Sequence, residues 1–200
     1  KIYLGGNEYI VNKMQEVFSL NGTRAFDVDF MSPVYDKPFE VIACTLETVP
    51  ASVEASLPAG GHLKGCRIGF DAGGSDRKVS AVVDGEVIFS EETVWFPKTN
   101  ADPEYHYAGI LDSFKRAAAK MPRVDAIGVS SAGIYIDNEV RVASLFIKVP
   151  RDEFDAKVRD MYIRAAKEIG DVPLTVANDG DVTALAGALS LKHGRVLCIA

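Results

Sequence analysis

Two adjacent glycines stand at the end of a predicted strand in this 200-residue chain. The apolar run over 66–71 is followed by Gly73, Gly74 and Ser75. Glycines let the backbone approach a ligand closely and direct N–H groups at it, and the Ser75 hydroxyl adds a further donor. The segment therefore suits a bound phosphate group. A glycine-rich turn beside a solvated charge cluster would explain the same residues, and both interpretations stay open.

Charged residues flank these glycines on both sides. Asp71 ends the strand, where its carboxylate is placed to hold Mg²⁺ through water. Beyond the glycines, Lys78 or Arg77 adds a positive charge. The pattern is neither a Rossmann nor a Walker motif, because no helix follows the glycines and GxxxxGK[ST] is absent. It predicts a phosphate-binding turn that opens a hairpin.

Two further segments lie at predicted strand ends. The pair Asn178-Asp179 stands between a strand and a helix. Asp179 either caps that helix or accepts the proton of an attacking hydroxyl in phosphoryl transfer. Asn178 is either an ordinary turn residue or a donor to substrate hydroxyls. The small residues of 130–133, Ser-Ser-Ala-Gly, either let a ligand lie over the strand end or form a plain tight turn.

Alternating strands and helices after residue 65 position these segments. Asp84-Gly85 joins two alternating runs and is a strong signal for a type I′ hairpin, and Asp102 is the expected N-cap of a helix. We predict strands at 66–71, 125–134, 173–179 and 195–200, hairpins at 78–92 and 134–145, and helices at 102–121, 151–169 and 180–193. This order predicts an α/β fold, a mixed sheet with helices on its faces.

The residues before this region carry weaker signals. Apolar positions at helical spacing predict a helix over 7–20, and an apolar run predicts a strand over 38–49. The stretch over 50–65 is rich in Pro, Gly, Ala and Ser and is typical of a connection. We therefore predict two parts, an N-terminal extension of unknown role at 1–64 and a folded lobe at 65–200.

The overall charge limits the classes of partner. The 22 Lys and Arg residues against 28 Asp and Glu residues give a net charge of −6 and a pI near 5.1. This balance argues against a main role in binding nucleic acid or an anionic membrane. No apolar run approaches the roughly 20 residues that span a bilayer, and a signal peptide is not recognisable. We expect a soluble, cytoplasmic protein.

Several single residues are assigned to the structure rather than to chemistry. The cysteines are far apart and lack metal-ligand spacing, which favours buried reduced thiols: Cys44, Cys66 and Cys198. The histidines are expected in exposed or half-buried structural roles: His62, His106 and His193. Trp95 either stacks on a ligand ring or packs as a core or edge-strand aromatic.

Taken together, the order of these motifs resembles the first lobe of the ROK family. That family comprises sugar kinases and sugar-responsive repressors of the actin/hexokinase/Hsp70 superfamily, built on a ribonuclease-H-like fold. The resemblance covers 66–200, and three segments carry it: GFDAGGSDRKVSAVVDGEV, GVSSAGIYIDNEV and VPLTVANDGDVTALAGA.

The resemblance implies a role for each motif. Asp71, Gly73, Gly74 and Ser75 match the first phosphate loop of the family, and Lys78 matches its basic position just beyond. Asp179 matches the catalytic base. The sugar-contacting positions are matched by Asn178 and by the loop from Ser131 to Gly133. The family's second phosphate loop would begin just past Ala200, and its zinc site would lie further on.

The chain departs from the family pattern mainly on the sugar side. Ser75 replaces the usual Thr and keeps the hydroxyl. Ala132 stands where many members have Pro, and Ala177 stands where glucokinases have Glu. The segment 143–154 has no Asn-Leu pair, where sugar kinases place a substrate-binding Asn.

The resemblance implies an ATP- and Mg²⁺-dependent phosphotransferase acting on a sugar or another small polyol. We expect a homodimer with a small-molecule substrate. A non-catalytic sugar sensor or scaffold that keeps the cleft is the alternative, and the altered sugar-side positions are the reason to consider it. An ATPase or activator that acts on a protein partner is a third possibility, but it gives no reason for a sugar-type Asn-Asp motif.

Overall fold

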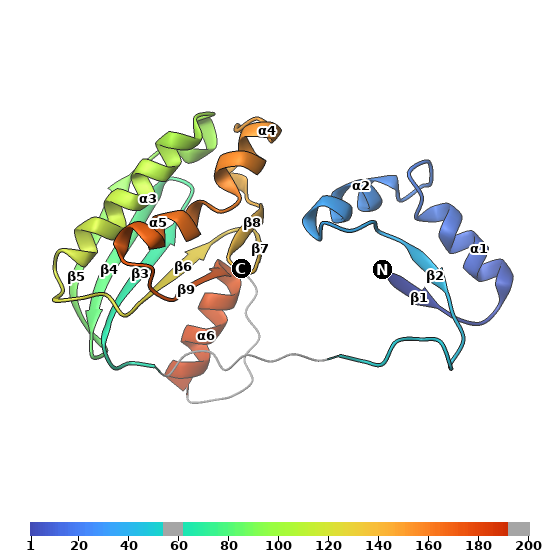
Figure 1. Cartoon of the computed structure of the whole chain (residues 1–200), viewed down its shortest axis with the longest axis horizontal. Helices are drawn as coiled ribbons and strands as arrows, with labels where there is room; N and C mark the ends of the chain where they lie inside the picture. The colour runs from blue at the N-terminus through green and yellow to red at the C-terminus, as the bar shows by residue number, and fades with distance from the viewer. Residues whose placement is uncertain (54–61, 192–200) are drawn as a thin grey trace. The chain divides into compact units, whose positions relative to one another are not determined.

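The computed structural model describes residues 1–53 and 62–191 of the chain. The chain divides into two compact units, Lys1–Leu57 and Pro58–Ala200 (Figure 1). The strand predicted over 195–200, together with His193 and Cys198, lies outside the described residues. None of the helices in the described part is long and apolar enough to cross a membrane.

The first unit contains two helices and a pair of short parallel strands. Its elements are β1 (Ile2–Leu4), α1 (Glu8–Val17), α2 (Ala25–Val34) and β2 (Val41–Ala43). Helix α1 was predicted, and Asn7 caps it by accepting a hydrogen bond from the Tyr9 backbone N–H at 2.8 Å. Helix α2 was not predicted, because its sequence AFDVDFMSPV lacks a helical apolar period and contains Pro33.

The predicted strand over 38–49 is much shorter in the structure. Strand β2 spans three residues only. Beyond it the chain turns, because the Val49 N–H donates to the Thr45 carbonyl at 2.9 Å and the Thr45 N–H donates to the Thr48 hydroxyl at 2.8 Å. Local hydrogen bonds from Thr side chains thus compete with strand pairing after Ala43.

The second unit is built on a five-stranded mixed sheet in the order β5-β4-β3-β6-β9. Its strands are β3 (Cys66–Ala72), β4 (Asp76–Val83), β5 (Glu86–Val94), β6 (Ala126–Ser131) and β9 (Leu174–Asn178). Strand β4 is antiparallel to both of its neighbours, whereas β6 and β9 run parallel to β3. This is the strand order of the ribonuclease-H-like fold, so the predicted fold class is confirmed.

The β4–β5 turn adopts the predicted hairpin geometry. Asp84 and Gly85 have φ values of 52° and 88°. Two successive positive φ angles define the type I′ turn, whose twist matches that of the flanking strands. The Asp84 side chain also accepts a hydrogen bond from the Gly65 N–H at 2.7 Å, which ties the hairpin to the start of β3.

Helix α3 (Pro103–Ala118) covers one face of the sheet. The Asp102 side chain caps it by accepting from the Glu104 N–H at 2.9 Å, as predicted. Ile110, Phe114 and Ala117 lie on its inner face and have no exposed surface. The Phe114 ring meets that of Phe70 from β3 edge to face, with centroids 5.4 Å apart.

The helix predicted over 151–169 is interrupted. It consists of α4 (Arg151–Glu153), a wider π-helical turn η3 (Phe154–Val158), and α5 (Met161–Ile169), which packs beside α3. The Arg159 N–H donates to the Phe154 carbonyl at 3.1 Å, an i to i−5 bond. The Arg159 carbonyl accepts from the Val140 N–H of strand β8 (Glu139–Val142) at 2.8 Å. In an unbroken helix this carbonyl would accept from an N–H of the helix itself.

A small hairpin, β7 (Ile134–Ile136) and β8 (Glu139–Val142), supports the edge strand β9. Asn138 at its tip donates to the Leu174 carbonyl at 3.1 Å and accepts from the Val176 N–H at 2.8 Å. One amide side chain thereby satisfies two backbone groups on the side of β9 where the described residues supply no further strand. Strand β9 leads directly into α6 (Asp179–Leu191), which contacts β6 and β9.

The two faces of the sheet differ in how they are covered. Alternate residues of β3, namely Ile68, Phe70 and Ala72, are buried among the apolar residues that α3 and α5 contribute. On the opposite face Gly128 and Thr175 are exposed beside α6. The apolar face holds the strands together by packing. On the opposite face, the small residues leave open space.

Removing the Phe114 ring tests this core. Phe114→Ala should lower the free energy of unfolding by about 3–5 kcal/mol, because a fully buried ring is replaced by a cavity. Urea unfolding followed by fluorescence of the single tryptophan, Trp95, reports on this unit. Val87→Ala on the exposed side of β5 is the control and should change stability by less than about 0.5 kcal/mol. A loss below about 1 kcal/mol for Phe114→Ala would contradict the packing described here.

Candidate functional site

The register of the parallel strands brings the three predicted motifs to one edge of the sheet. Asp71 of β3 pairs with Ser130 of β6, which pairs with Ala177 of β9. One position further along, Ala72, Ser131 and Asn178 form the next row. The glycine turn, the small-residue loop and the Asn-Asp pair all begin where these rows end. Segments more than 100 residues apart in sequence therefore lie side by side.

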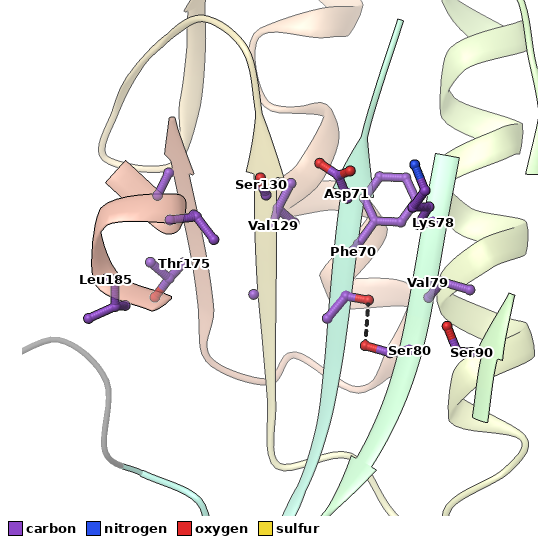
Figure 2. A pocket seen from close by; sticks show the side chains of 14 residues that line it. Phe70, Asp71, Lys78, Val79, Ser80, Ser90, Val129, Ser130, Thr175 and Leu185 are labelled. Carbon is purple, nitrogen blue, oxygen red and sulfur yellow. Dashed lines mark hydrogen bonds between the residues drawn. The ribbon is translucent and has the colours of Figure 1, made fainter. Parts of the chain in front are cut away.

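A cavity of about 480 Å³ opens on the sheet face beneath this edge (Figure 2). The side chains of Asp71 and Lys78 are directed to its upper end, while Thr175 and Leu185 lie at the other side. The lining is mostly small or apolar and consists of Gly69, Phe70, Asp71, Lys78, Val79, Ser80, Ser90, Gly128, Val129, Ser130, Thr175, Ala177, Val182 and Leu185.

The glycine turn between β3 and β4 is held from the side by a buried tryptophan. The Trp95 indole N–H donates to the Gly73 carbonyl at 2.8 Å, and the Trp95 backbone N–H donates to the Ser75 carbonyl at 3.1 Å. A Cβ on Gly73 would lie 2.7 Å from the Asp76 carbonyl oxygen, so the turn requires glycine there. Trp95 is 1% exposed, which makes it a core aromatic and leaves no ring face for a ligand.

The ammonium group of Lys78 is engaged by a neighbouring carboxylate. Its Nζ lies 2.7 Å from Asp76 Oδ1 and 4.0 Å from Glu92 Oε2. The Ser75 hydroxyl donates to Asp76 Oδ2 at 3.0 Å. Hydrogen bonding by Lys78 and then by Ser75 lowers the pKa of Asp76, and Asp76 raises the pKa of Lys78. Two of the predicted phosphate ligands thus bind Asp76 in this structure.

Arg77, the other basic residue considered beside the glycines, faces away from the cavity. Its guanidinium donates to the Ser113 hydroxyl at 2.9 Å and lies 3.4 Å from the Asp112 carboxylate, both on α3. It also lies over the Trp95 ring at 5.7 Å from the centroid. Arg77 therefore belongs to the helix-covered side of the sheet.

Asp71 is the residue that the sequence predicts as a ligand for Mg²⁺. It is half-buried at the end of β3, and no hydrogen bond to its carboxylate is found among the described residues. Within residues 1–53 and 62–191, no three His, Cys, Asp or Glu side chains gather as a metal site. One carboxylate fits a Mg²⁺ ion that arrives with a phosphate chain, because Mg²⁺ commonly keeps waters and few protein ligands.

Asn178 and Asp179 occupy the start of α6. Asn178 Oδ1 accepts from the Gly180 N–H at 2.8 Å and its Nδ2 donates to the Gly133 carbonyl at 2.9 Å. Asn178 thus caps the helix and ties down the loop after β6. Asp179 Oδ1 also lies 3.0 Å from the Gly180 nitrogen. For Asp179 Oδ2, the described part of the chain supplies no hydrogen-bond partner.

The loop after β6 presents its backbone toward the edge. Gly133 has a φ of 151°, and a Cβ there would overlap the Val142 carbonyl oxygen, so only glycine is accommodated. The Ser131 side chain is 1% exposed and reaches the Ala72 carbonyl at 3.4 Å. Ser130 lines the cavity in its place.

Two tyrosines lie beneath this loop. Burial raises the pKa of Tyr135 to about 12, an effect that the Ser131 hydroxyl opposes and the Asp179 charge reinforces. Tyr162 is fully buried, which raises its pKa, and the negative charges near it include Asp71. Both phenols therefore stay neutral near the site. Tyr162 lies within the helix predicted over 151–169, and no sequence motif marked it as close to the site.

A lysine that sequence analysis missed lies against the glycine turn. Lys98 belongs to the short turn η1 (Pro97–Thr99) after β5. A Cβ on Gly74 would lie 2.9 Å from the Lys98 Nζ. No motif marked this residue, because the whole β4–β5 hairpin separates it from Gly74 in the sequence.

No protein-family model and no curated protein matches this chain. Similar solved structures include glucokinase from Parabacteroides distasonis, inorganic polyphosphate/ATP-glucomannokinase from Arthrobacter sp. strain KM and ROK hexokinase from Thermus thermophilus. A ROK family transcriptional regulator is matched as well.

These similarities are partial. In the order given for the three kinases, the identities are 19%, 22% and 15% and the TM-scores are 0.49, 0.47 and 0.45. The matches cover 64%, 62% and 62% of this chain and 35%, 48% and 37% of the respective structures. The chain therefore spans less than half the length of each. ROK proteins are among the solved structures that it resembles, as the sequence motifs predicted.

The Lys78–Asp76 pair can be tested by titration. Lys78→Met should raise the pKa of Asp76 toward the ordinary aspartate value of about 3.9, because its strongest hydrogen-bond donor is lost. A depressed pKa in the folded state means that the pair stabilises the protein above the unfolded-state pKa and that this stability is lost as the pH falls. Carbon-detected NMR of the Asp76 carboxyl group measures the shift.

The exposed Lys115 of α3 supplies the control for that titration. Lys115→Met removes the same charge and should leave the pKa of Asp76 where it is. An equal pKa of Asp76 in the unaltered protein and in Lys78→Met would refute the pairing.

Proposed function

We propose that the protein is an ATP-dependent phosphotransferase of ROK type that phosphorylates a hydroxyl group of a sugar or a related small polyol. The observation that supports this most strongly is the register of β3, β6 and β9. It brings the glycine turn, Asp71 and Asp179 to one edge of the sheet, where they would bind phosphate, hold a cation and accept a proton. Phosphoryl transfer needs these three functions together.

The phosphate chain would lie over the glycine turn. The Gly73 and Gly74 amides can donate to phosphate oxygens where side chains would block the approach. Asp71 would hold Mg²⁺ through water, and Mg²⁺ bound there would neutralise charge on the phosphates. Because Trp95 fixes the turn by two hydrogen bonds, its donors are oriented before the ligand arrives.

Asp179 would act as the general base. The attacking hydroxyl oxygen forms a bond to the γ-phosphorus, the bond from that phosphorus to the bridging oxygen breaks, and ADP leaves. Asp179 takes the proton of the attacking hydroxyl at Oδ2. Asn178 serves as a positioning residue, because its amide binds both the Gly180 N–H and the Gly133 carbonyl.

The substrate would rest between Asp179 and the loop after β6. Gly133 and the exposed Ala132 offer backbone groups there, and Ser130 offers a hydroxyl from the cavity wall. Ser131, matched to a sugar contact by resemblance, is buried, so its contribution would be to hold the loop.

A sugar sensor without catalysis is the second candidate. Ala177 lies in the same row as Asp71 and Ser130 and lines the cavity without a polar group. Glucokinases place Glu at the matching position, so the change removes a potential sugar contact. A sensor would bind a sugar but release no ADP.

Asp179→Asn tests the proposed chemistry in the full-length protein. ADP release from Mg²⁺-ATP is measured over a panel of sugars and polyols with a coupled assay. The substitution should lower kcat by about 10²–10⁴-fold, because a positioned base is lost while the shape of the site is kept. Binding of the substrate should change little.

A neighbouring aspartate gives the matched control for that experiment. Asp181 lies in the same first turn of α6 and is exposed. Asp181→Asn makes the same chemical change and should leave kcat within about twofold of the unaltered protein. Turnover retained by Asp179→Asn would contradict the assignment of the base. Sugar binding without ADP release for any compound of the panel would favour the sensor.

A further inference from the structure

The side chain of Lys98 covers the glycine turn. If Gly74 carried a Cβ, that atom would lie 2.8 Å from Lys98 Cε and 2.9 Å from Nζ. The aliphatic part of Lys98 therefore packs directly on the Gly74 backbone, and its ammonium group ends beside the turn. The absence of a side chain at Gly74 is what allows this contact.

The backbone that carries Lys98 is fixed to the start of α3. The Phe96 N–H donates to the Tyr105 hydroxyl at 2.9 Å, and the Pro97 carbonyl lies 3.0 Å from Nε2 of His106. His106 has no exposed surface, so it is fully buried, whereas the sequence predicted an exposed or half-buried structural role. Lys98 thus has an exposed side chain on a backbone that these hydrogen bonds anchor. It follows Trp95, which is hydrogen-bonded to the same turn, by three residues.

Unlike the other basic residues near the turn, Lys98 has no counterion among the described residues. Across residues 1–53 and 62–191, no carboxylate oxygen lies within 4.0 Å of Lys98 Nζ, whereas Lys78 Nζ contacts Asp76 at 2.7 Å. Arg77 is committed to α3. Of the three cations, Lys98 alone has its charge available for an anion in the described structure.

We propose that Lys98 is a phosphate-binding residue of the glycine turn and supplies its available positive charge. This inference rests on the proposed function, because it takes the ligand of the turn to be a polyphosphate chain such as that of ATP. Lys78 acts mainly through Asp76, to which it and the Ser75 hydroxyl are bound, and so holds the first residue of β4 in place.

The chemistry of the arrangement favours an anion with several oxygens. Backbone N–H groups from a glycine turn bind one phosphate, and a lysine ammonium beside them neutralises the charge on the same or the next phosphate. The long side chain of Lys98 can rotate from Gly74 toward a bound phosphate without moving the anchored backbone. Lys98, which follows the β4–β5 hairpin, thereby completes a site formed by the glycine turn that precedes the hairpin.

The test measures binding of inorganic tripolyphosphate and of Mg²⁺-ATP to the full-length protein by calorimetry. Lys98→Met keeps an aliphatic chain over Gly74 and removes the charge. The dissociation constant of both probes should rise by about 10- to 100-fold, the range expected for loss of a charged hydrogen bond. Lys78→Met should have a smaller effect than Lys98→Met, and Lys115→Met on α3 should change binding by less than about twofold.

The outcomes separate this inference from the proposed function. If the unaltered protein binds both probes and Lys98→Met binds them equally well, the role of Lys98 is overturned while the phosphate site stands. A larger loss for Lys78→Met than for Lys98→Met would overturn it as well. If the unaltered protein binds neither probe, both the role of Lys98 and the phosphotransferase proposal fail. The Tm of each variant should lie within about 2 °C of that of the unaltered protein. A loss of binding can then be attributed to the substitution and not to unfolding.

Discussion

The parallel pairing of β3, β6 and β9 is the constraint on which the candidate site depends. In parallel strands the carboxyl ends lie at the same edge, and the chain must leave each strand there. Asp71, Ser130 and Ala177 occupy one row, so the segments that follow them converge whatever their separation in sequence. A slip of one residue in any pairing would turn Asp71 or Ser130 to the helix-covered face.

The apolar side of the sheet holds this register. Phe70 and Phe114 pack edge to face between β3 and α3, and the buried residues of α5 extend the same layer. Among the described residues no strand pairs with the outer side of β9, and Asn138 supplies two hydrogen bonds there. The rigid face is therefore apolar and closed, while the face with Gly128 and Thr175 stays open to form the cavity. This division lets stability and binding use different residues.

Local signals predicted the second unit well. The Asp84-Gly85 turn and the Asp102 cap depend on adjacent residues only, and both occur as expected. The interruption at Arg159 escaped prediction because its cause is a hydrogen bond to Val140, which is remote in sequence. Helix α2 was missed because its ten residues show no apolar period.

The site was predicted in its positions and less well in its contacts. The sequence placed Asp71, Asn178 and Asp179 at strand ends, and the register puts them together. It could not tell that Ser131 points into the core or that Asp76 binds Lys78, since both depend on packing between elements. Lys98 carries no local signal at all, because only the folded hairpin brings it to Gly74.

The proposed function requires that the edge formed by β3, β6 and β9 binds the transferred phosphate between the glycine turn and Asp179. A crystal structure of the full-length protein with Mg²⁺ and a non-hydrolysable ATP analogue would show where the phosphates lie. We expect phosphate oxygens within about 3 Å of the Gly73 or Gly74 amides and a terminal phosphate that faces Asp179. An analogue bound elsewhere, with the glycine turn and Asp179 untouched, would contradict it.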